Sequence, residues 1–471
     1  MAVLDTSTIE AEIAKIVGKE NVSTDIVDLI AHERDDQFAT VPPHLPDFIV
    51  RPANKAEIQE VIRLANENKI PVVPYGSGIN RKGLCIAQRG GIILDLRRMR
   101  KIEIDEEMMI AKIGPGVNFV EMVTALNKYP HLRCLAPDAP ATASVLANYM
   151  LRGIYPTATR YGIDHLITME IILPNGEILD TGSAATPGSP GPYCGIVNGP
   201  DLTKLFQANV GTMGVITEGR IRLYPMPEKI VPLTIRYKDF KSMIEPARKF
   251  AYKNLVAGIW VMTFDPEAIE TFMGIRGADE EVFMSLVFLE GTEEEVQKHK
   301  EQVVKIAAAS NGDTMDLPDF MAKEFVQDHR YMRSFIRGWR KGNLWGCSVY
   351  APMTNVVKMY EDSKKLCKKN NLEGRLHFEA IPVHPFHNGQ LTYVDPCVMW
   401  DGGKPEEVEN IRQLSADIRQ SFLDIGIYGF FRAFPGTVNS HELGMYGEIW
   451  RKIKKLIDPN NIMNPGNPPL H

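Results

Sequence analysis

A short glycine-containing stretch is the first place where residue types and spacing suggest chemistry. The segment PVVPYGSGIN opens with Val72 and Val73, which predict a short buried strand, and then places Gly76 and Gly78 two residues apart. Residues without a Cβ let successive backbone N–H groups face one point, and such a concave set of donors suits a phosphate or pyrophosphate. A Gly-Ser-Gly step also forms ordinary turns, so this motif alone leaves an anion site and a plain turn equally open.

The segments around this stretch predict alternating strands and helices. The segment 48–51, which begins with three apolar residues, predicts a strand that ends at Pro52, and amphipathic spacing predicts a helix over 54–68, so that Val72 and Val73 close a β–α–β unit. Residues 7–35 also have a helical pattern. Two more apolar runs and one more helix are predicted over 91–96, 109–113 and 118–128. The first half of the chain is therefore expected to mix helices and strands.

The composition describes a globular protein of two or more domains. The chain has 471 residues, of which 44% are hydrophobic and 24% charged, and its net charge is −6. The negative charge and the lack of a long lysine and arginine run argue against nucleic-acid binding. No stretch approaches the roughly 20 apolar residues of a membrane span. The N-terminus, MAVLDTSTIEAEIAKIVG, carries acids early and lacks a signal-peptide pattern, so we expect a cytoplasmic protein.

The cysteines do not form a motif. Six cysteines are scattered along the chain without a Cys-x-x-Cys pair. This spacing argues against an iron–sulfur or zinc cradle, and a disulfide framework is not expected in a chain of this size.

Several longer blocks together resemble one family. They are RPANKAEIQEVIRLANENKIPVVPYGSGIN, GGIILDL, AKIGPGV, PDAPATASVLANYMLRG, RYGIDHLITMEIILPNGEILDTGS, DLTKLFQANVGTMGVITEGRIRLYPMPE and the terminal IKKLIDPNNIMNPGN. In this order they resemble the FAD-linked oxidoreductases of the vanillyl-alcohol oxidase and para-cresol methylhydroxylase superfamily. The blocks cover most of the first 230 residues and the last 45.

The resemblance implies an α+β protein with a discontinuous FAD-binding domain of the para-cresol methylhydroxylase (PCMH) type and an inserted α/β cap. The break at Tyr224-Pro225-Met226-Pro227 marks the first boundary. We expect the FAD-binding domain at 1–229, the cap or substrate domain at 230–425, and a closing segment at 426–471 that returns to the FAD-binding domain.

The resemblance also implies which residues bind FAD, mainly through backbone donors around the pyrophosphate. The expected cofactor-binding residues are Tyr75, Gly76, Ser77, Gly78, Asn80, Pro137, Ser144, Asn148, Gly153, Gly214, Val215 and Ile216. Members that attach the flavin from this domain often carry a histidine in the glycine loop, and the loop here reads GSGINRKG. We therefore expect non-covalent FAD. Attachment through His384 or His387 of the cap stretch PVHPFHNGQLTYVD is the alternative.

The same two histidines raise the question of a metal ion, since imidazoles can share one. The hydroxy-acid branch of the superfamily carries a cap metal site marked by Gly-His-x-Gly-Asp-Gly-Asn-x-His, and this pattern is missing here. Because Pro385 separates the pair, His384 and His387 do not share a helical turn. We expect no metal and interpret them as a strand-edge pair near the flavin.

The chemistry implied by the family needs a hydride acceptor, a base and a positive charge near the reduced flavin. An aspartate in a Pro-Asp step lies near flavin N5 in the vanillyl-alcohol oxidase branch, and the matching residue here is Asp138. The closing segment of the family supplies a Tyr-Arg pair, which is Phe431-Arg432 here. A second phenolate-binding tyrosine aligns with Lys82-Gly83. Asp138 and Arg432 are thus the expected catalytic residues, with a solvated turn aspartate as the alternative for Asp138.

The loss of both tyrosines makes a para-hydroxybenzyl substrate doubtful, because a buried phenolate short of donors costs several kcal/mol. Lys82 could compensate. The expected substrate contacts are Lys82, Tyr331, Arg333, Trp345, Tyr350, His387 and Phe431. The aromatic members of this set could instead be core residues of the cap.

Three functions remain open. The first is an FAD-dependent dehydrogenase or oxidase that takes a hydride from an alcohol or benzylic carbon of a small molecule. The second is a 2-hydroxy-acid dehydrogenase of the glycolate or lactate type, favoured by the block GTMGVITEGRIRLYP. The third is a flavin-carrying electron-transfer subunit. An electron-acceptor protein, either a cytochrome or an electron-transfer flavoprotein, and a homo-oligomer are the expected protein partners.

Overall fold

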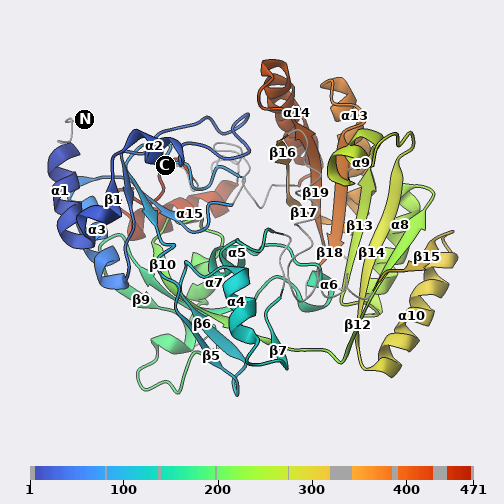
Figure 1. Ribbon diagram of the computed structural model, residues 1–471, viewed down its shortest axis with the longest axis horizontal. Coiled ribbons are helices and arrows are strands. Elements are labelled where there is room, and N and C mark those ends of the chain that lie inside the picture. Colours follow the sequence, from blue (N-terminus) through green and yellow to red (C-terminus); the bar gives the residue numbers. More distant parts are fainter. Residues whose placement is uncertain are drawn as a thin grey trace.

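The computed structural model describes residues 6–79, 82–135, 139–196, 199–273, 275–318, 342–383, 391–427 and 443–467. It confirms the expected α+β class, with three larger sheets and helices packed on them (Figure 1). None of the described helices combines the length and the apolar character that crossing a membrane requires.

The first sheet contains the predicted β–α–β unit. Its strand order is β1 (Val22–Ser23), β2 (Phe48–Val50), β4 (Ile92–Asp95) and β3 (Val72–Tyr75), and β2 and β3 both run parallel to β4. The crossover helix is α3 (Lys55–Asn68), whose N-cap Asn54 accepts a hydrogen bond from the backbone N–H of Glu57. The parallel strands end together, so the chain leaves β3 at the carboxyl edge of the sheet, where ligands bind in open α/β sheets.

The predicted helix over 7–35 is interrupted. Helix α1 (Thr6–Val17) ends before Gly18, whose φ of 88° is outside the helical range. A 3-10 turn, η1 (Lys19–Asn21), and strand β1 follow, and α2 (Ile26–Ile30) is a separate short helix. The amphipathic pattern thus predicted the helical residues of α1 and α2 correctly, and it was wrong for residues 18–25 and 31–35, which are not α-helical.

The second sheet is antiparallel and lies beside the first. Its order is β5 (Ile102–Asp105), β6 (Ile110–Ile113), β10 (Val215–Arg222), β8 (Leu166–Ile172) and β9 (Ile178–Asp180). Helices α4 (Phe119–Leu126) and α5 (Val145–Met150) cover it. The smaller elements are β7 (Leu132–Arg133), α6 (Ala158–Tyr161), η2 (Gly182–Ala185), α7 (Leu202–Phe206) and β11 (Tyr224–Pro225).

The third sheet is formed by residues 229–400 and is antiparallel throughout. The strand order is β15 (Asp313–Asp316), β12 (Lys229–Tyr237), β14 (Val282–Gly291), β13 (Gly258–Phe264), β18 (Leu376–Pro382), β19 (Leu391–Trp400) and β16 (Asn343–Gly346), and β17 (Val349–Pro352) also pairs with β19. The helices associated with it are α8 (Phe240–Tyr252), α9 (Pro266–Met273), α10 (Glu293–Ala308), η4 (Met353–Asn355), α13 (Val356–Lys369) and α14 (Pro405–Asp424).

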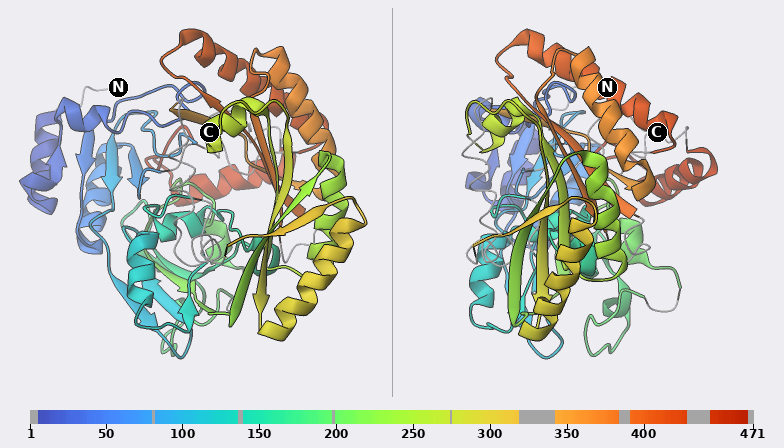
Figure 2. Two further views of the ribbon diagram at one scale, coloured as in Figure 1. Left: turned by 45° about the vertical axis from the view of Figure 1, so that its right-hand side comes forward. Right: turned by 90° about the vertical axis from the view of Figure 1, so that its right-hand side faces the viewer.

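The long helices α8, α10, α13 and α14 lie on the outer face of this third sheet, and its inner face is turned toward the first half of the chain (Figures 1 and 2). The alternation of side chains along β13 follows this arrangement. Val261 packs in the outer core with the helices, whereas Trp260 and Met262 belong to the inner core, which they share with Tyr149 of α5. The inner face of this sheet therefore packs against the first half of the chain.

The C-terminal segment returns to the first sheet. Helix α15 (Gly444–Ile457) is followed by an extended stretch that runs along β3, where the backbone N–H of Val72 donates to Ile462 O at 2.7 Å and that of Asn464 donates to Val72 O at 2.8 Å. The C-terminal segment thus meets the first sheet at β3, the strand that leads into the glycine loop. The domain boundaries at 229/230 and 425/426 remain a prediction.

Candidate active site

The glycine loop that follows β3 exposes backbone donors. Gly78 has a φ of 70°, in the left-handed region, and a Cβ there would lie 1.8 Å from the hydroxyl oxygen of Tyr75, so only glycine fits. No residue in the described part of the chain accepts a hydrogen bond from the backbone N–H groups of residues 76–79. A tight turn with several free N–H groups is a typical anion-binding arrangement.

The first wall beside the loop is the start of α5. A Cβ on Gly76 would lie 3.5 Å from the Cβ atoms of both Ser144 and Ala147, so the loop packs directly against this helix. Ser144 is the N-cap of α5: its hydroxyl accepts a hydrogen bond from the N–H of Ala147 at 3.2 Å and donates to Pro115 O at 2.7 Å. Ser144 therefore fixes the helix start against the turn that contains Pro115.

The second wall is the turn before β10. A Cβ on Gly211 would lie 3.0 Å from Cγ of Pro74, and Asn464 of the C-terminal stretch donates to Val210 O at 2.7 Å. Lys454 is buried beneath this turn and donates to Thr212 O at 2.6 Å. The C-terminal segment thus anchors the turn that faces the glycine loop.

The Lys454 ammonium also binds the Asp458 carboxylate, and Asp458 in turn accepts the backbone N–H groups of Ile462 and Met463 at 3.1 and 2.8 Å. Burial lowers the pKa of Lys454, and the Asp458 carboxylate opposes this change. Both residues belong to the terminal block IKKLIDPNNIMNPGN, whose sequence predicted no role for this pair. A lysine and an aspartate four residues apart at a helix end normally form an exposed pair. The sequence therefore did not indicate that this pair is buried.

The cradle formed by the loop, the α5 start and the 209–215 turn fits the pyrophosphate of FAD, because it offers free backbone N–H groups and no described acidic side chain hydrogen-bonds to the loop. The Tyr75 side chain packs against Gly78 of the same loop. Its ring contacts His32 edge-on at 4.9 Å between centroids and lies 5.4 Å from the Arg97 guanidinium carbon. Burial raises the pKa of the Tyr75 hydroxyl.

The other expected cofactor residues lie on both walls. Asn148 of α5 accepts a hydrogen bond from the Tyr155 hydroxyl at 2.7 Å, and a Cβ on Gly153 would lie 2.6 Å from the same Asn148 oxygen. On the other wall, Gly214 leads into β10, where Val215 and Ile216 pair with β8. The structure thus brings these residues to the same region as the glycine loop. Their contacts with FAD remain a prediction.

Two expected substrate residues lie where the first half of the chain meets the third sheet. Lys82 follows the glycine loop, and its Nζ donates to the backbone oxygen of Gly346 at the end of β16, at 2.7 Å. Tyr350 of β17 donates its hydroxyl to Arg152 O at 3.2 Å, next to Gly153. Burial raises the pKa of the Tyr350 hydroxyl. Both residues therefore connect the cap strands to elements of the FAD cradle.

Trp345 is placed differently. Its side chain is fully buried in the outer core, together with Trp400 and the helices of that face. This placement favours the core alternative that the sequence left open for the cap aromatics. The alternation along β16 puts Leu344 and Gly346 on the inner face instead.

Several expected site residues lie outside the described part of the chain. They are Asn80, Pro137, Asp138, Tyr331, Arg333, His384, His387, Phe431 and Arg432. Their roles stay predictions.

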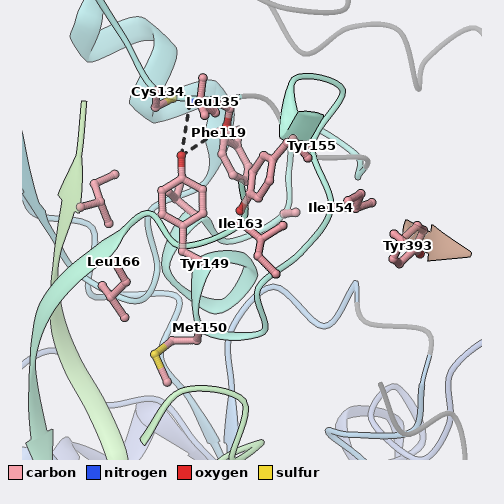
Figure 3. Packing of buried hydrophobic residues seen from close by; sticks show 14 of the residues in the cluster. Phe119, Cys134, Leu135, Tyr149, Met150, Ile154, Tyr155, Ile163, Leu166 and Tyr393 are labelled. Atoms are coloured by element: carbon pink, nitrogen blue, oxygen red, sulfur yellow. Dashed lines mark hydrogen bonds between the residues drawn. The ribbon is translucent and has the colours of Figure 1, made fainter. Parts of the chain in front are cut away.

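One described contact lies just before Asp138. The buried Tyr149 hydroxyl both accepts the N–H of Leu135 and donates to its carbonyl, each at 3.3 Å (Figure 3). Burial raises the pKa of this hydroxyl well above its usual range, so it stays neutral and keeps its proton for the donated bond. Tyr149 therefore fixes the backbone three residues before the expected base.

A polar group that the sequence analysis did not single out lies on the inner face of the third sheet. Ser348 donates to Oδ2 of Asp395 at 2.9 Å, and the Tyr393 hydroxyl lies 2.9 Å from Ser348 Oγ and 3.1 Å from the same Oδ2. Glu379 of β18 lies opposite Asp395 of β19 in the strand register. A single acidic residue within a largely apolar strand, as in HFEAIP and YVDPCV, is the sequence feature that could have indicated this group.

Comparisons with known proteins agree with this architecture. Residues 46–182 match the family model of an FAD binding domain, and residues 446–467 match that of the FAD linked oxidases, C-terminal domain. The chain is 26% identical to a mitochondrial D-lactate dehydrogenase [cytochrome] of Arabidopsis thaliana over 96% of this chain and 78% of that protein. It is also 26% identical to the 4-cresol dehydrogenase [hydroxylating] flavoprotein subunit of Pseudomonas putida over 96% of this chain and 93% of that protein.

Among solved structures, p-cresol methylhydroxylase with substrate bound superposes with a TM-score of 0.84 at 21% identity, covering 99% of this chain and 98% of that chain. The chain therefore contains an FAD binding domain and the C-terminal segment of the FAD linked oxidases in a PCMH-type fold, and FAD is its cofactor.

Proposed function

We propose that the protein oxidises a hydroxyl-bearing or benzylic carbon of a small molecule that binds between the glycine-loop region and the inner face of the third sheet. The observation that carries this proposal is the contact region between the first half of the chain and the third sheet. Lys82 and Tyr350 bridge the two regions at 2.7 and 3.2 Å, and a buried hydroxyl and carboxylate group formed by Ser348, Tyr393 and Asp395 lies on the adjacent cap strands. Ligand sites of enzymes favour such junctions, with an apolar wall and a few convergent polar groups.

Bound FAD would supply the hydride acceptor. The chain must then provide the base that takes the companion proton, and we assign this role to Asp138. The support is its Pro-Asp step within the family-like block and the two hydrogen bonds by which Tyr149 holds the preceding Leu135. Arg432 is the proposed positive charge that stabilises the reduced cofactor.

A neutral alcohol or alkyl-aromatic substrate is the first candidate. The inner face of the third sheet presents Trp260, Phe264 and other apolar side chains beside the carboxyl groups of Glu379 and Asp395. A substrate carboxylate beside two buried carboxyl groups would be repelled unless a cation intervened. These features favour an uncharged substrate.

A 2-hydroxy acid is the second candidate. The similarity to a D-lactate dehydrogenase supports it, and Lys82 is a cation at the same junction that could pair with a substrate carboxylate. The electron acceptor remains a proposal as well, with a cytochrome or an electron-transfer flavoprotein as the expected partner.

Anaerobic reduction of the FAD-loaded protein tests the proposal. Aryl alcohols, alkylphenols, glycolate and both lactate enantiomers would be added singly while the visible flavin absorbance is followed. Bleaching by an alcohol or alkylphenol supports the first candidate, and bleaching by a hydroxy acid supports the second. If no compound of either class reduces the cofactor, the electron-transfer subunit becomes the better account.

The variant Asp138→Asn completes this test. It removes the base and keeps the size of the side chain, so we expect FAD to stay bound while the reduction rate falls by about 100-fold or more. Normal turnover of this variant would remove Asp138 from the mechanism.

A further inference from the structure

The hairpin of β18 and β19 carries four metal-ligating side chains on one face. In the strand register His377 lies opposite Cys397 and Glu379 lies opposite Asp395. Positions two apart on a strand share a face, so the four side chains occupy the corners of one patch. All four are at most 6% exposed, and the patch lies on the inner face of the third sheet, because Cys397 and the neighbouring Ile381 belong to the inner core.

Three of the four side chains converge tightly. Glu379, Asp395 and Cys397 each offer a ligand atom, and these atoms all lie within 4.8 Å of one another. The ligands of one four-coordinate ion are about 3 to 4 Å apart, as metal–ligand distances of about 2.0 to 2.3 Å require. The group therefore needs only side-chain adjustment to close around an ion.

The fourth side chain is held in the form that a metal requires. His377 Nδ1 lies 2.9 Å from the carbonyl oxygen of Thr263, which can only accept, so Nδ1 carries a proton. Nε2 lies 3.7 Å from a Glu379 oxygen and is the ring nitrogen that would bind the ion. Ligating histidines typically donate their other ring N–H to a backbone carbonyl in this way.

Asp395 supplies a second, independent observation. Its Oδ2 accepts hydrogen bonds from Ser348 and Tyr393, which orient the carboxylate, whereas Oδ1 is buried and has no hydrogen-bond partner among the described residues. A buried carboxylate oxygen without a partner is unfavourable, and a cation would satisfy it.

Gly346 keeps the space beside this oxygen open. A Cβ at that residue would lie 3.0 Å from Oδ1 of Asp395 and 3.3 Å from Sγ of Cys397. The unpartnered oxygen and the sulfur thus face the same point, next to the strand end that Lys82 contacts.

We infer that Glu379, Asp395, Cys397 and His377 bind one divalent transition-metal ion, with Zn²⁺ as the best fit. A thiolate and an imidazole select against Mg²⁺ and Ca²⁺, and two carboxylates complete a donor set that zinc accepts. The expectation of no metal was based on the scattered cysteines and on the pair His384 and His387. The proposed site does not use that histidine pair, and it combines Cys397 with three residues that the strand register brings beside it.

A metal ion at this site would change which substrates bind, and this inference rests on the proposed function. A bound divalent ion would offset the negative charge of Glu379 and Asp395 on the inner face. A substrate carboxylate would then be admitted, so zinc loading should shift the preference toward 2-hydroxy acids.

Zinc binding can be tested without turnover. The full-length FAD-bound protein would be stripped with a chelator, dialysed against Zn²⁺ and analysed for metal content, for affinity by calorimetry, and by X-ray absorption at the zinc edge. We expect one zinc per chain with one sulfur neighbour at about 2.3 Å. Protein that retains no zinc above the chelator-treated background, or zinc without a sulfur neighbour, would overturn the inference.

Variants identify the ligands. Cys397→Ser should remove the sulfur signal, and Asp395→Asn should weaken zinc binding at least about tenfold, as loss of even an orienting partner typically does. Cys194→Ser, in a loop of the first half of the chain, is the control and should change neither. Unchanged zinc affinity in Asp395→Asn would contradict the assignment.

Gly346→Ala provides a test that leaves all four ligands in place. Its methyl group would occupy the space facing Oδ1 and Sγ, so we expect weaker zinc binding in a folded protein that still binds FAD. If the ligand variants fail to fold, this variant and the absorption spectrum of the unaltered protein decide the matter. Because none of these measurements uses a substrate, their outcome is independent of the proposed reaction.

Discussion

At the scale of single residues, Tyr149 is the described side chain most closely tied to the expected base. Its buried hydroxyl satisfies both backbone groups of Leu135. Tyr149→Phe would leave these groups without partners, so we expect the free energy of unfolding to fall by about 1–3 kcal/mol. We also expect slower substrate-dependent flavin reduction with unchanged FAD affinity, because the backbone leading to Asp138 would be less well fixed.

Denaturant unfolding and stopped-flow reduction measure these two effects. Tyr252→Phe is a matched control, since Tyr252 is 71% exposed, and should affect neither. A Tyr149→Phe protein with unchanged stability and unchanged reduction rate would show that the hydroxyl contributes to neither.

Residue types indicated some features of the candidate site and left others open. The glycine turn and the helix cap at Ser144 could be predicted from sequence because backbone conformation and helix capping depend on local residues. For Trp345 the sequence left a substrate contact and a core position open, and the side chain packs among the helices of the outer core. The group around Asp395 was not predicted, because Ser348, which precedes β17, meets Tyr393 and Asp395 of β19 only in the folded sheet.

At the scale of elements, the C-terminal helix α15 contacts the 209–215 turn of the cofactor cradle through Lys454. Lys454 donates to the backbone oxygens of Thr212 and Met463 and pairs with Asp458. Lys454→Met would remove these donors and leave the carboxylate of Asp458 buried beside an apolar side chain. We expect weaker FAD binding, by about tenfold or more, together with lower stability.

Equilibrium titration of the apoprotein with FAD measures this change. Lys455→Met is the matched control, because Lys455 is the next residue on the same helix and is exposed. FAD affinity that falls equally in both variants would point to a general effect of lost charge rather than to the buried contact.

A buried histidine, His165, directly precedes strand β8 and stays neutral. His165 is fully buried with Nδ1 2.8 Å from the Tyr224 hydroxyl, and burial lowers its pKa from 6.5 to about 3. The unfolded chain therefore binds the proton more readily than the folded one between these values. The stability from the neutral ring is fully present above about pH 6.5 and is lost as pH falls toward 3, by about 1.4 kcal/mol per pH unit.

Unfolding free energies measured between pH 7 and pH 4.5 check this dependence. His165→Gln should flatten the slope, and His44→Gln, at an exposed histidine, should leave it unchanged. An identical slope in the unaltered protein and in His165→Gln would contradict the low pKa of this histidine.

At the scale of the whole molecule, the first half of the chain and the third sheet are joined by a buried ion pair. Arg133 of β7 makes two hydrogen bonds to the carboxylate of Glu290 of β14, at 2.8 and 2.7 Å, and Tyr161 adds a third at 2.9 Å. The side chains of the pair are 3% and 1% exposed. Removing one partner would leave a buried charge unpaired, so Glu290→Gln should cost about 3–5 kcal/mol of stability.

The nearby pair of Lys229 and Glu293 is exposed and serves as the control. Glu293→Gln should change stability by no more than about 1 kcal/mol. Equal losses in the two variants would show that burial of the Arg133 pair does not matter for the joined structure.

The order of sequence blocks predicted the mixed α+β architecture, and it also led to the expectation that the C-terminal segment returns to the FAD-binding domain. It did not predict how the third sheet faces the cradle, because contacts such as Lys82 with Gly346 join residues far apart in the chain. The division of the chain into domains at 229/230 and 425/426 is still to be tested, for example by limited proteolysis.

The account depends most on the claim that the free backbone donors of residues 76–79 hold the FAD pyrophosphate. The direct measurement is the FAD bound per chain, determined by absorbance and protein assay, in the purified protein and in Gly78→Val. We predict one FAD per unaltered chain and loss of binding in Gly78→Val, where a side chain would meet both a left-handed φ and Tyr75. A purified chain that stays colourless when offered FAD, or a variant that binds FAD as well as the unaltered protein, would contradict it.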